Sequence, residues 1–238
     1  MRNQYIAFLG PNSTFRTPLR SDSLWGMICW GIRMVYGQNG NDKLNRYLNS
    51  CINGQPEFII SSTFPYTEFK DKKTLFFPRP FLPFPKAQAE KLKVEETELA
   101  IKNRKKLKKI NFIPQDLFLR LVLGQLPRKE LDKALLDENL TIPEVDNIHI
   151  THNTLDRRTW ITVKENEETS GQLFHSEEQF LASNIYPNEE EAKLIRESKL
   201  TAPKSGLFFL IQGENLELLR PALRYLETTG FGADRNTG

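Results

Sequence analysis

Cysteine and histidine are both scarce in this sequence. The two cysteines among 238 residues, Cys29 and Cys51, lie far apart, with the spacing of neither a metal site nor a disulfide framework. The three histidines are His149, His152 and His175. The pair His149-x-x-His152 lacks a convincing third ligand for zinc. We therefore expect two core thiols in a reducing compartment, and neither a metal nor another cofactor.

Long hydrophobic runs and nucleotide-binding motifs are also absent. No run approaches the ~18 residues of a membrane span, and the N-terminus lacks the pattern of a secretion signal. We therefore expect a cytoplasmic protein with no membrane partner. The absence of Gly-Lys-Ser/Thr argues against an ATP site, and the C-terminal glycines follow a helix-like segment, which argues against NAD. The net charge of +3 is small, so any nucleic-acid site must be local.

Strand and helix patterns alternate in the first part of the chain. Residues 5–9 predict a strand, and residues 21–36 and 42–53 predict helices with one hydrophobic face each. Residues 57–64 and 74–77 predict strands rich in Phe, Ile and Thr. This order of strand, helices, strand and strand is the opening of a ferredoxin-like fold.

An insertion at about residues 78–110 interrupts this order. Its four prolines between residues 78 and 85 exclude a central strand, because proline donates no ladder hydrogen bond. Residues 86–109 contain no Gly or Pro and favour a helix with a thin hydrophobic stripe. The helix ends in the basic run 102–109. That run is either a solvated helix face or a contact to RNA phosphates.

The second half of the chain has shorter patterns. Residues 116–123 and 130–140 predict short helices, residues 206–211 a strand and residues 215–229 a helix. Between them, Ile148 and Ile150 alternate with polar residues, which predicts a strand that runs into a polar projection.

Two adjacent arginines, Arg157 and Arg158, lie at the expected tip of this projection. Guanidinium groups on a loop favour contacts to phosphates or base faces. The neighbouring Asn153 and Asp156 either take part in such contacts or organise a turn through hydrogen bonds to the backbone.

The last nine residues combine three glycines with polar side chains. Glycine lets a ligand approach the main chain, and clustered amides form a concavity that binds anions. The alternative is a helix C-cap at Gly230 followed by a flexible tail. The candidate phosphate-binding residues of this loop are Gly230, Gly232, Arg235, Asn236, Thr237 and Gly238.

Three segments together resemble a known family. They are residues 21–26 (Ser-Asp-Ser-Leu-Trp-Gly), residues 153–157 (Asn-Thr-Leu-Asp-Arg) and the glycine-rich residues 230–238. In this order they are similar to the RAMP superfamily of CRISPR-associated RNA-binding proteins. The likeness is greatest to the family of the fourth subunit of the type III-A Csm effector complex.

The resemblance implies an α+β fold of tandem ferredoxin-like (RRM-like) domains with a thumb hairpin and a glycine-rich C-terminal loop. We expect an N-terminal domain at residues 1–130, which carries the insertion. The thumb and a C-terminal ferredoxin-like domain follow at residues 131–238. In that fold the glycine loop leads into a final strand, so we expect the second domain to be incomplete at Gly238.

The resemblance also implies a function. The chain is expected to be a non-catalytic scaffold that holds the repeat-derived 5′ tag of the guide RNA and joins the large signalling subunit to the backbone RAMP subunits. The alternatives are the equivalent subunit of a sister type III complex and a metal-independent, histidine-based endoribonuclease that processes guide RNA. Besides the glycine-loop residues, the expected RNA-binding residues are Arg20, His152, Asn153, Arg157 and Arg158.

Replacing Arg157 and Arg158 together with alanine should weaken RNA binding and reduce its salt dependence. Each lost phosphate contact removes about 0.7 units of log–log slope on a single strand. Fluorescence anisotropy of labelled guide RNA over a NaCl series measures both effects. An unchanged slope would contradict the prediction.

Overall fold

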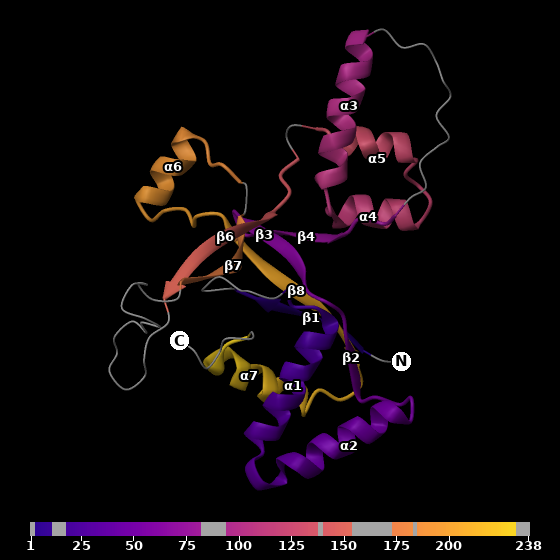
Figure 1. Ribbon diagram of the computed structural model, residues 1–238, viewed down its shortest axis with the longest axis vertical. Coiled ribbons are helices and arrows are strands. Elements are labelled where there is room, and N and C mark those ends of the chain that lie inside the picture. Colours follow the sequence, from indigo (N-terminus) through magenta and orange to yellow (C-terminus); the bar gives the residue numbers. More distant parts are fainter. Residues whose placement is uncertain are drawn as a thin grey trace, which may run out of the picture. The chain divides into compact units, whose positions relative to one another are not determined.

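A computed structural model describes residues 3–10, 18–81, 94–137, 140–153, 173–182 and 185–231. Helices and strands are interspersed along the chain (Figure 1). In chain order the elements are β1 (Asn3–Leu9), α1 (Ser21–Val35), the 3-10 turn η1 (Gly37–Asn39), α2 (Gly40–Ile52), β2 (Phe58–Ile60), β3 (Phe64–Phe69), β4 (Lys72–Pro78), α3 (Val94–Lys109), β5 (Phe112–Pro114), α4 (Gln115–Val122), α5 (Arg128–Leu135), β6 (Glu144–Asn153), β7 (Leu173–Ala182), α6 (Glu189–Arg196), β8 (Lys204–Gly213) and α7 (Leu219–Thr229).

The elements belong to two compact units, each built from separated stretches of chain. Unit 1 comprises Met1–Thr63, Val145–Phe180 and Phe209–Gly238, and unit 2 comprises Phe64–Glu144 and Leu181–Phe208. The predicted boundary after residue 130, between consecutive ferredoxin-like domains, divides the chain differently and stays a prediction.

The core of unit 1 lies between helices α1 and α7 and the strands β1, β2 and β8 (Figure 1). Hydrophobic residues recur at helical spacing on α1 and α7, so each helix buries one face. Fully burying a side chain of this size contributes about 1.5–3 kcal/mol. The core residues include Leu24, Ile28, Ile32, Phe58, Phe209, Ile211, Leu219, Ala222 and Leu226.

Tyr47 connects α2 to this core. Its ring stacks on Phe58 with centroids 4.5 Å apart, and its hydroxyl donates to the Phe58 carbonyl at 3.3 Å and accepts from Trp25 Nε1 at 3.1 Å. Burial raises the pKa of the Tyr47 phenol. Burial likewise raises the pKa of the neighbouring Cys29 thiol to about 12, so this cysteine stays a neutral core thiol at physiological pH.

The sheet of unit 2 has the strand order β8-β3-β4-β5, with antiparallel neighbours. An aromatic cluster packs against it. Phe77 stacks on Phe118 with centroids 4.9 Å apart, and it meets Phe208 edge-on at 5.5 Å. Phe64 contacts both Phe77 and Phe208.

Helices α3, α4 and α5 gather around a second core in unit 2, made of Ile113, Leu117, Leu126, Leu131 and Leu135. The C-terminal end of α3 joins this core, because Leu107 and Ile110 are partly buried against it. The predicted insertion helix is therefore confirmed over Val94–Lys109. Among the described side chains of α3, Leu107 is the one partly buried against this core, and Ile110 follows the helix.

Strand β8 reveals an irregularity that the sequence patterns missed. Ile60 pairs with Ile211 and Phe64 with Phe208, so three residues on one side face two on the other, as in a β-bulge. Ser61 bonds Leu210 twice, donating its N–H to the carbonyl and accepting the Leu210 N–H on Oγ, both at 2.9 Å. The single strand predicted at residues 57–64 is thus wrong, because the bulge divides it.

Several short elements were not predicted. Strands β5 and β7, helix α6 and the β3–β4 hairpin are absent from the sequence-based assignment. Lys70 and Asp71 form the hairpin turn with φ values of 51° and 58°, which Gly or Asn more commonly adopts. The helix predicted at residues 130–140 ends at Leu135. Pro221 fits within the first turn of α7, where its missing N–H costs no hydrogen bond.

Gly40 is a position where α1 and α2 allow no side chain. A Cβ there would collide with the backbone carbonyl of Arg33, whereas one at Gly26 of α1 would meet no atom within 4 Å. We expect Gly40→Ala to lower the free energy of unfolding by about 1–3 kcal/mol. The control Gly26→Ala should leave it unchanged or raise it by up to about 1 kcal/mol. Urea unfolding followed by circular dichroism compares them, and equal stabilities would contradict this packing.

Candidate nucleic-acid interface

Strands β6 and β7 form a two-stranded sheet. Thr151 Oγ1 lies 3.0 Å from His175 Nδ1, and His149 Nδ1 lies 3.8 Å from Glu177 Oε1. The residue earlier in β6, His149, thus contacts the residue later in β7, Glu177, so the two strands are antiparallel. This antiparallel pair, β6 with β7, is called the hairpin below. It lies where the sequence predicts a strand that runs into a polar projection.

The hairpin has two different faces because side chains alternate along a strand. His149, Thr151 and Asn153 share an exposed face with His175 and Glu177. The side chains of His149 and Glu177 are 70% and 67% exposed, so the contact between them is well solvated. This face offers imidazole, hydroxyl, amide and carboxylate groups, a mixture that suits hydrogen bonds to base edges as well as phosphates.

His152 lies on the opposite face. Its Nε2 is 2.7 Å from Ser176 Oγ, and the side chain is half-buried. His152 and Asn153, both predicted to bind RNA, thus point to opposite sides of the strand. The same alternation separates His149 from His152, so they cannot share a metal on one face. Among the described residues, no cluster of His, Cys, Asp and Glu could hold a metal ion.

Helix α1 begins beside the bulge at Ser61. Leu19 is buried, and its carbonyl accepts the N–H and the hydroxyl of Thr63 at 3.0 and 2.9 Å. The N–H of Ser21 donates to Ser62 Oγ at 3.0 Å. Ser21 and Asp22 are thus the first two residues of α1, and the N-cap is Arg20, whose side chain makes no capping hydrogen bond.

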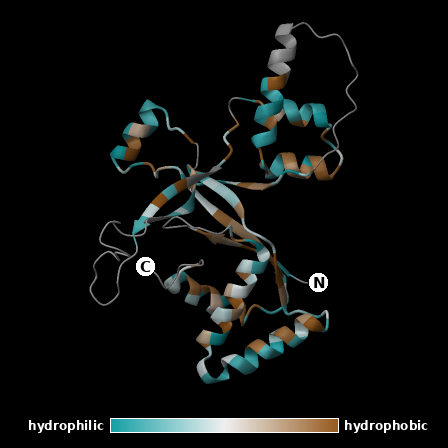
Figure 2. Ribbon diagram, in the orientation of Figure 1, coloured by the Kyte–Doolittle hydropathy of each residue, from teal (hydrophilic) through white to brown (hydrophobic). Residues whose placement is uncertain are grey.

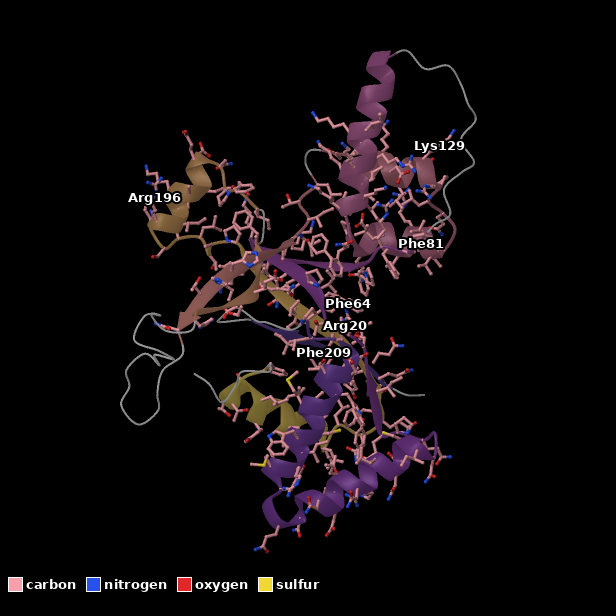
Figure 3. All side chains as sticks on the ribbon, viewed as in Figure 1. Arg20, Phe64, Phe81, Lys129, Arg196 and Phe209 are labelled. Atoms are coloured by element: carbon pink, nitrogen blue, oxygen red, sulfur yellow. The ribbon has the colours of Figure 1, made fainter. Side chains whose placement is uncertain are left out.

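Arg20 is exposed at this helix start (Figure 3). Within the described part of the chain, the N–H groups of Asp22 and Ser23 have no protein acceptor. A guanidinium and two unpaired amides at the positive end of a helix dipole are suited to an anion, although the Asp22 carboxylate competes for the same donors.

Gly230 ends α7 as its C-cap, with φ of 83° and its N–H donating to the Leu226 carbonyl at 2.8 Å. The positive φ explains why glycine occupies this position. Phe231 is partly buried against the core of unit 1 and holds the start of the terminal segment. The remaining candidates lie outside the described residues: Arg157, Arg158, Gly232, Arg235, Asn236, Thr237 and Gly238.

Arg20, the hairpin residues and Gly230 all belong to unit 1. No described interaction joins these three groups directly, so they are separate parts of the candidate interface. Sequence reasoning missed the contribution of Thr151, His175 and Glu177 to the exposed face. Alternation along residues 148–153 could have indicated which β6 side chains share that face, but the register that adds β7 needed the structure.

Family membership follows from comparison with known proteins. The RAMP superfamily matches residues 10–238, and the chain belongs to this superfamily. No curated protein matches the sequence. The mixed fold with an antiparallel sheet is similar to a chain in the crystal structure of a Csm1-Csm4 cassette in complex with cA4. The TM-score is 0.53 at 19% identity, over 94% of this chain and 66% of that chain.

Two further solved structures are similar at lower TM-scores. A Csm1-Csm4 cassette in complex with cA3 gives 0.47 at 21% identity, over 94% of this chain and 65% of that chain. A Csm3-Csm4 subcomplex of the type III-A CRISPR-Cas interference complex gives 0.48 at 15% identity, over 98% and 66%. The sequence therefore spans about two thirds of the chains that it matches.

The bond between His152 and Ser176 should stabilise the hairpin. A double-mutant cycle with His152→Ala and Ser176→Ala should give a coupling free energy of about 0.5–1.5 kcal/mol, measured by chemical unfolding. The control cycle with His149→Ala and Glu177→Ala should give a value near zero, because water screens that exposed pair. A larger coupling in the control pair would contradict this assignment of faces.

Proposed function

We propose that this chain is a non-catalytic, RNA-binding scaffold subunit of a type III-A CRISPR effector, of the Csm4 kind. The observation that carries the proposal is the RAMP superfamily match over residues 10–238. The fold likeness to the Csm1-Csm4 cassette supports it. The three sequence segments that resemble the Csm fourth-subunit family point the same way.

The proposed ligand is the repeat-derived 5′ tag of the guide RNA. Arg20 and the amides at the start of α1 supply phosphate donors, and the exposed hairpin face supplies groups for bases and sugars. Arg157 and Arg158 follow β6 in the chain and are proposed to act with this face, as a thumb. Gly232, Arg235, Asn236, Thr237 and Gly238 follow the C-cap Gly230 and are proposed to bind tag phosphates through main-chain amides.

The proposed protein partners are the large signalling subunit and the backbone RAMP subunits, which this chain would join in the cytoplasm. The similar cassette pairs Csm1 with Csm4, which supports the first partner. Among the described helices, none is long and hydrophobic enough to cross a membrane.

An endoribonuclease is the second candidate, because His149 and His175 expose two imidazoles on one hairpin face. Catalysis would need one imidazole to take a proton from a 2′-hydroxyl and another group to protonate the leaving oxygen. Incubating the purified chain with precursor guide RNA decides between the two candidates. Cleavage that is abolished by His149→Ala with His175→Ala would establish the enzyme and overturn the non-catalytic proposal.

The glycine loop gives a direct test of tag binding. Gly232→Val with Gly238→Val should keep the fold and the protein partners but lose tagged guide RNA, because branched side chains obstruct a backbone approached by phosphates. The control is Gly10→Val, where an added Cβ meets no atom within 4 Å.

Each variant is co-purified with the effector subunits encoded beside it, and the bound RNA is sequenced. We expect the tag to be depleted only from the double variant. Retention of tagged guide at the parent level, with unchanged circular dichroism, would reduce the loop to a connector.

A further inference from the structure

The C-terminal half of α3 carries an unusual density of positive charge. Six of the eight residues from Lys102 to Lys109 are Lys or Arg, and none is acidic. The positively charged residues are Lys102, Arg104, Lys105, Lys106, Lys108 and Lys109. This cluster is far in sequence from every residue proposed above to hold the tag.

Positive charge is also segregated along the chain. Residues 101–137 contain ten Lys or Arg and four Asp or Glu, a net charge of +6, whereas the whole chain has +3. The other 201 residues therefore have a net charge of −3. The N-terminal half of α3 is acidic, with Glu95, Glu96 and Glu98. A polyanion near this protein would therefore be attracted to the C-terminal half of α3 and to the helices that follow it rather than to the molecule as a whole.

Helical geometry directs three of the lysines outward. Leu107 is partly buried against Ile113 and its neighbours and so marks the inner face of α3. At 100° per residue, Lys102, Lys105 and Lys109 lie roughly 140–160° away from Leu107. All three are exposed. They form an outer row with steps of about 4.5 and 6 Å along the axis, on a mainly hydrophilic helix end (Figure 2).

Arg79 fixes this end of the helix. Its Nη1 donates to the Leu107 carbonyl at 2.6 Å, and Nη2 donates to Asp132 of α5 at 3.2 Å. Arg128 bonds the same carboxylate through Nε at 3.4 Å. The backbone of α3 is thus held against its core, so the outer row is a preorganised array of charges rather than a flexible tail.

The helix dipole accounts for only part of this charge. Cations are stabilising in the last turn, where Lys106, Lys108 and Lys109 lie, but the effect falls off beyond that turn. The helix dipole therefore does not explain the positive charges of Lys102 and Lys105. Like charges three and four residues apart repel each other, and Lys102, Lys105 and Lys109 have no described ion pair.

The composition of the row favours nucleic acid over an acidic protein. Protein interfaces are depleted in lysine at their centres and enriched in aromatic residues, Met and Arg. The outer row consists of lysines, with Ile101 as the one hydrophobic residue beside it in the described part of the helix. Lysine provides a point charge that contacts phosphates without reading the base sequence.

We propose that Lys102, Lys105 and Lys109 form a second nucleic-acid contact, which binds the phosphate backbone of single-stranded RNA independently of its sequence and of the 5′ tag. This contact goes beyond the proposed function. The lysine row would hold any RNA strand through its phosphate charges, whereas the proposed tag site holds the 5′ end of the guide RNA.

The experiment measures binding of the full chain to a fluorescein-labelled, 20-nucleotide RNA of mixed sequence that lacks the tag. Anisotropy titrations over a NaCl series give the affinity and the log–log salt slope. For K102Q/K105Q/K109Q we expect a slope smaller by about 2 and affinity lower by roughly tenfold or more at 0.15 M NaCl. Glutamine preserves helix propensity, and circular dichroism verifies the fold.

Two matched variants control for charge and for position. K102R/K105R/K109R keeps the charges and should keep the parent slope. K72Q/K193Q/K204Q removes three exposed lysines from β4, α6 and β8 and should also keep it. Because the probe lacks the tag, failure here leaves the tag assignment intact.

Three outcomes would overturn the proposal. They are a parent protein that does not bind this RNA at low salt, a K102Q/K105Q/K109Q slope equal to the parent slope, and an equal loss in K72Q/K193Q/K204Q. If the protein bound labelled polyglutamate but not the RNA, the row would be assigned to an acidic protein partner instead.

Discussion

The fold depends on the pairing and burial of β8. β1, β2 and β3 all pair with this strand, and Leu207, Phe208 and Phe209 are buried in succession along it. Phe208 belongs to the aromatic cluster of unit 2 and Phe209 to the core of unit 1. A polar residue at either position would leave one of the two cores without its central aromatic ring.

The elements that could be predicted from the sequence are those in which a regular hydrophobic pattern repeats over many residues. Helices α1, α2 and α7 each present a hydrophobic face over three or more turns, and their ends lie within a few residues of the predicted ones. The β3–β4 hairpin could not be predicted, because Lys70 and Asp71 lack the usual turn signal. The bulge at Ser61 depends on the register with β8, which local sequence does not contain.

The candidate interface shows the same division. The polar projection was predictable from Ile148 and Ile150, whereas its partner strand β7 contains His175, Glu177 and Glu178 and shows no strong strand pattern. Separation of His152 from Asn153 follows from simple alternation and could have been predicted. The helix cap could not, since Ser62 is 41 residues away from Ser21.

Arg79 has a consequence for how relatives of this protein can differ. Its guanidinium bonds the Leu107 carbonyl, and its N–H donates to the carbonyl of Asn111 at 2.9 Å, so the two ends of the intervening segment are fastened at their base. Each doubling of a loop's length costs only about 0.6 kcal/mol once its ends are joined. Relatives can therefore differ in the length of the chain between Arg79 and Leu107 while the pairing of β4 with β5 keeps its register.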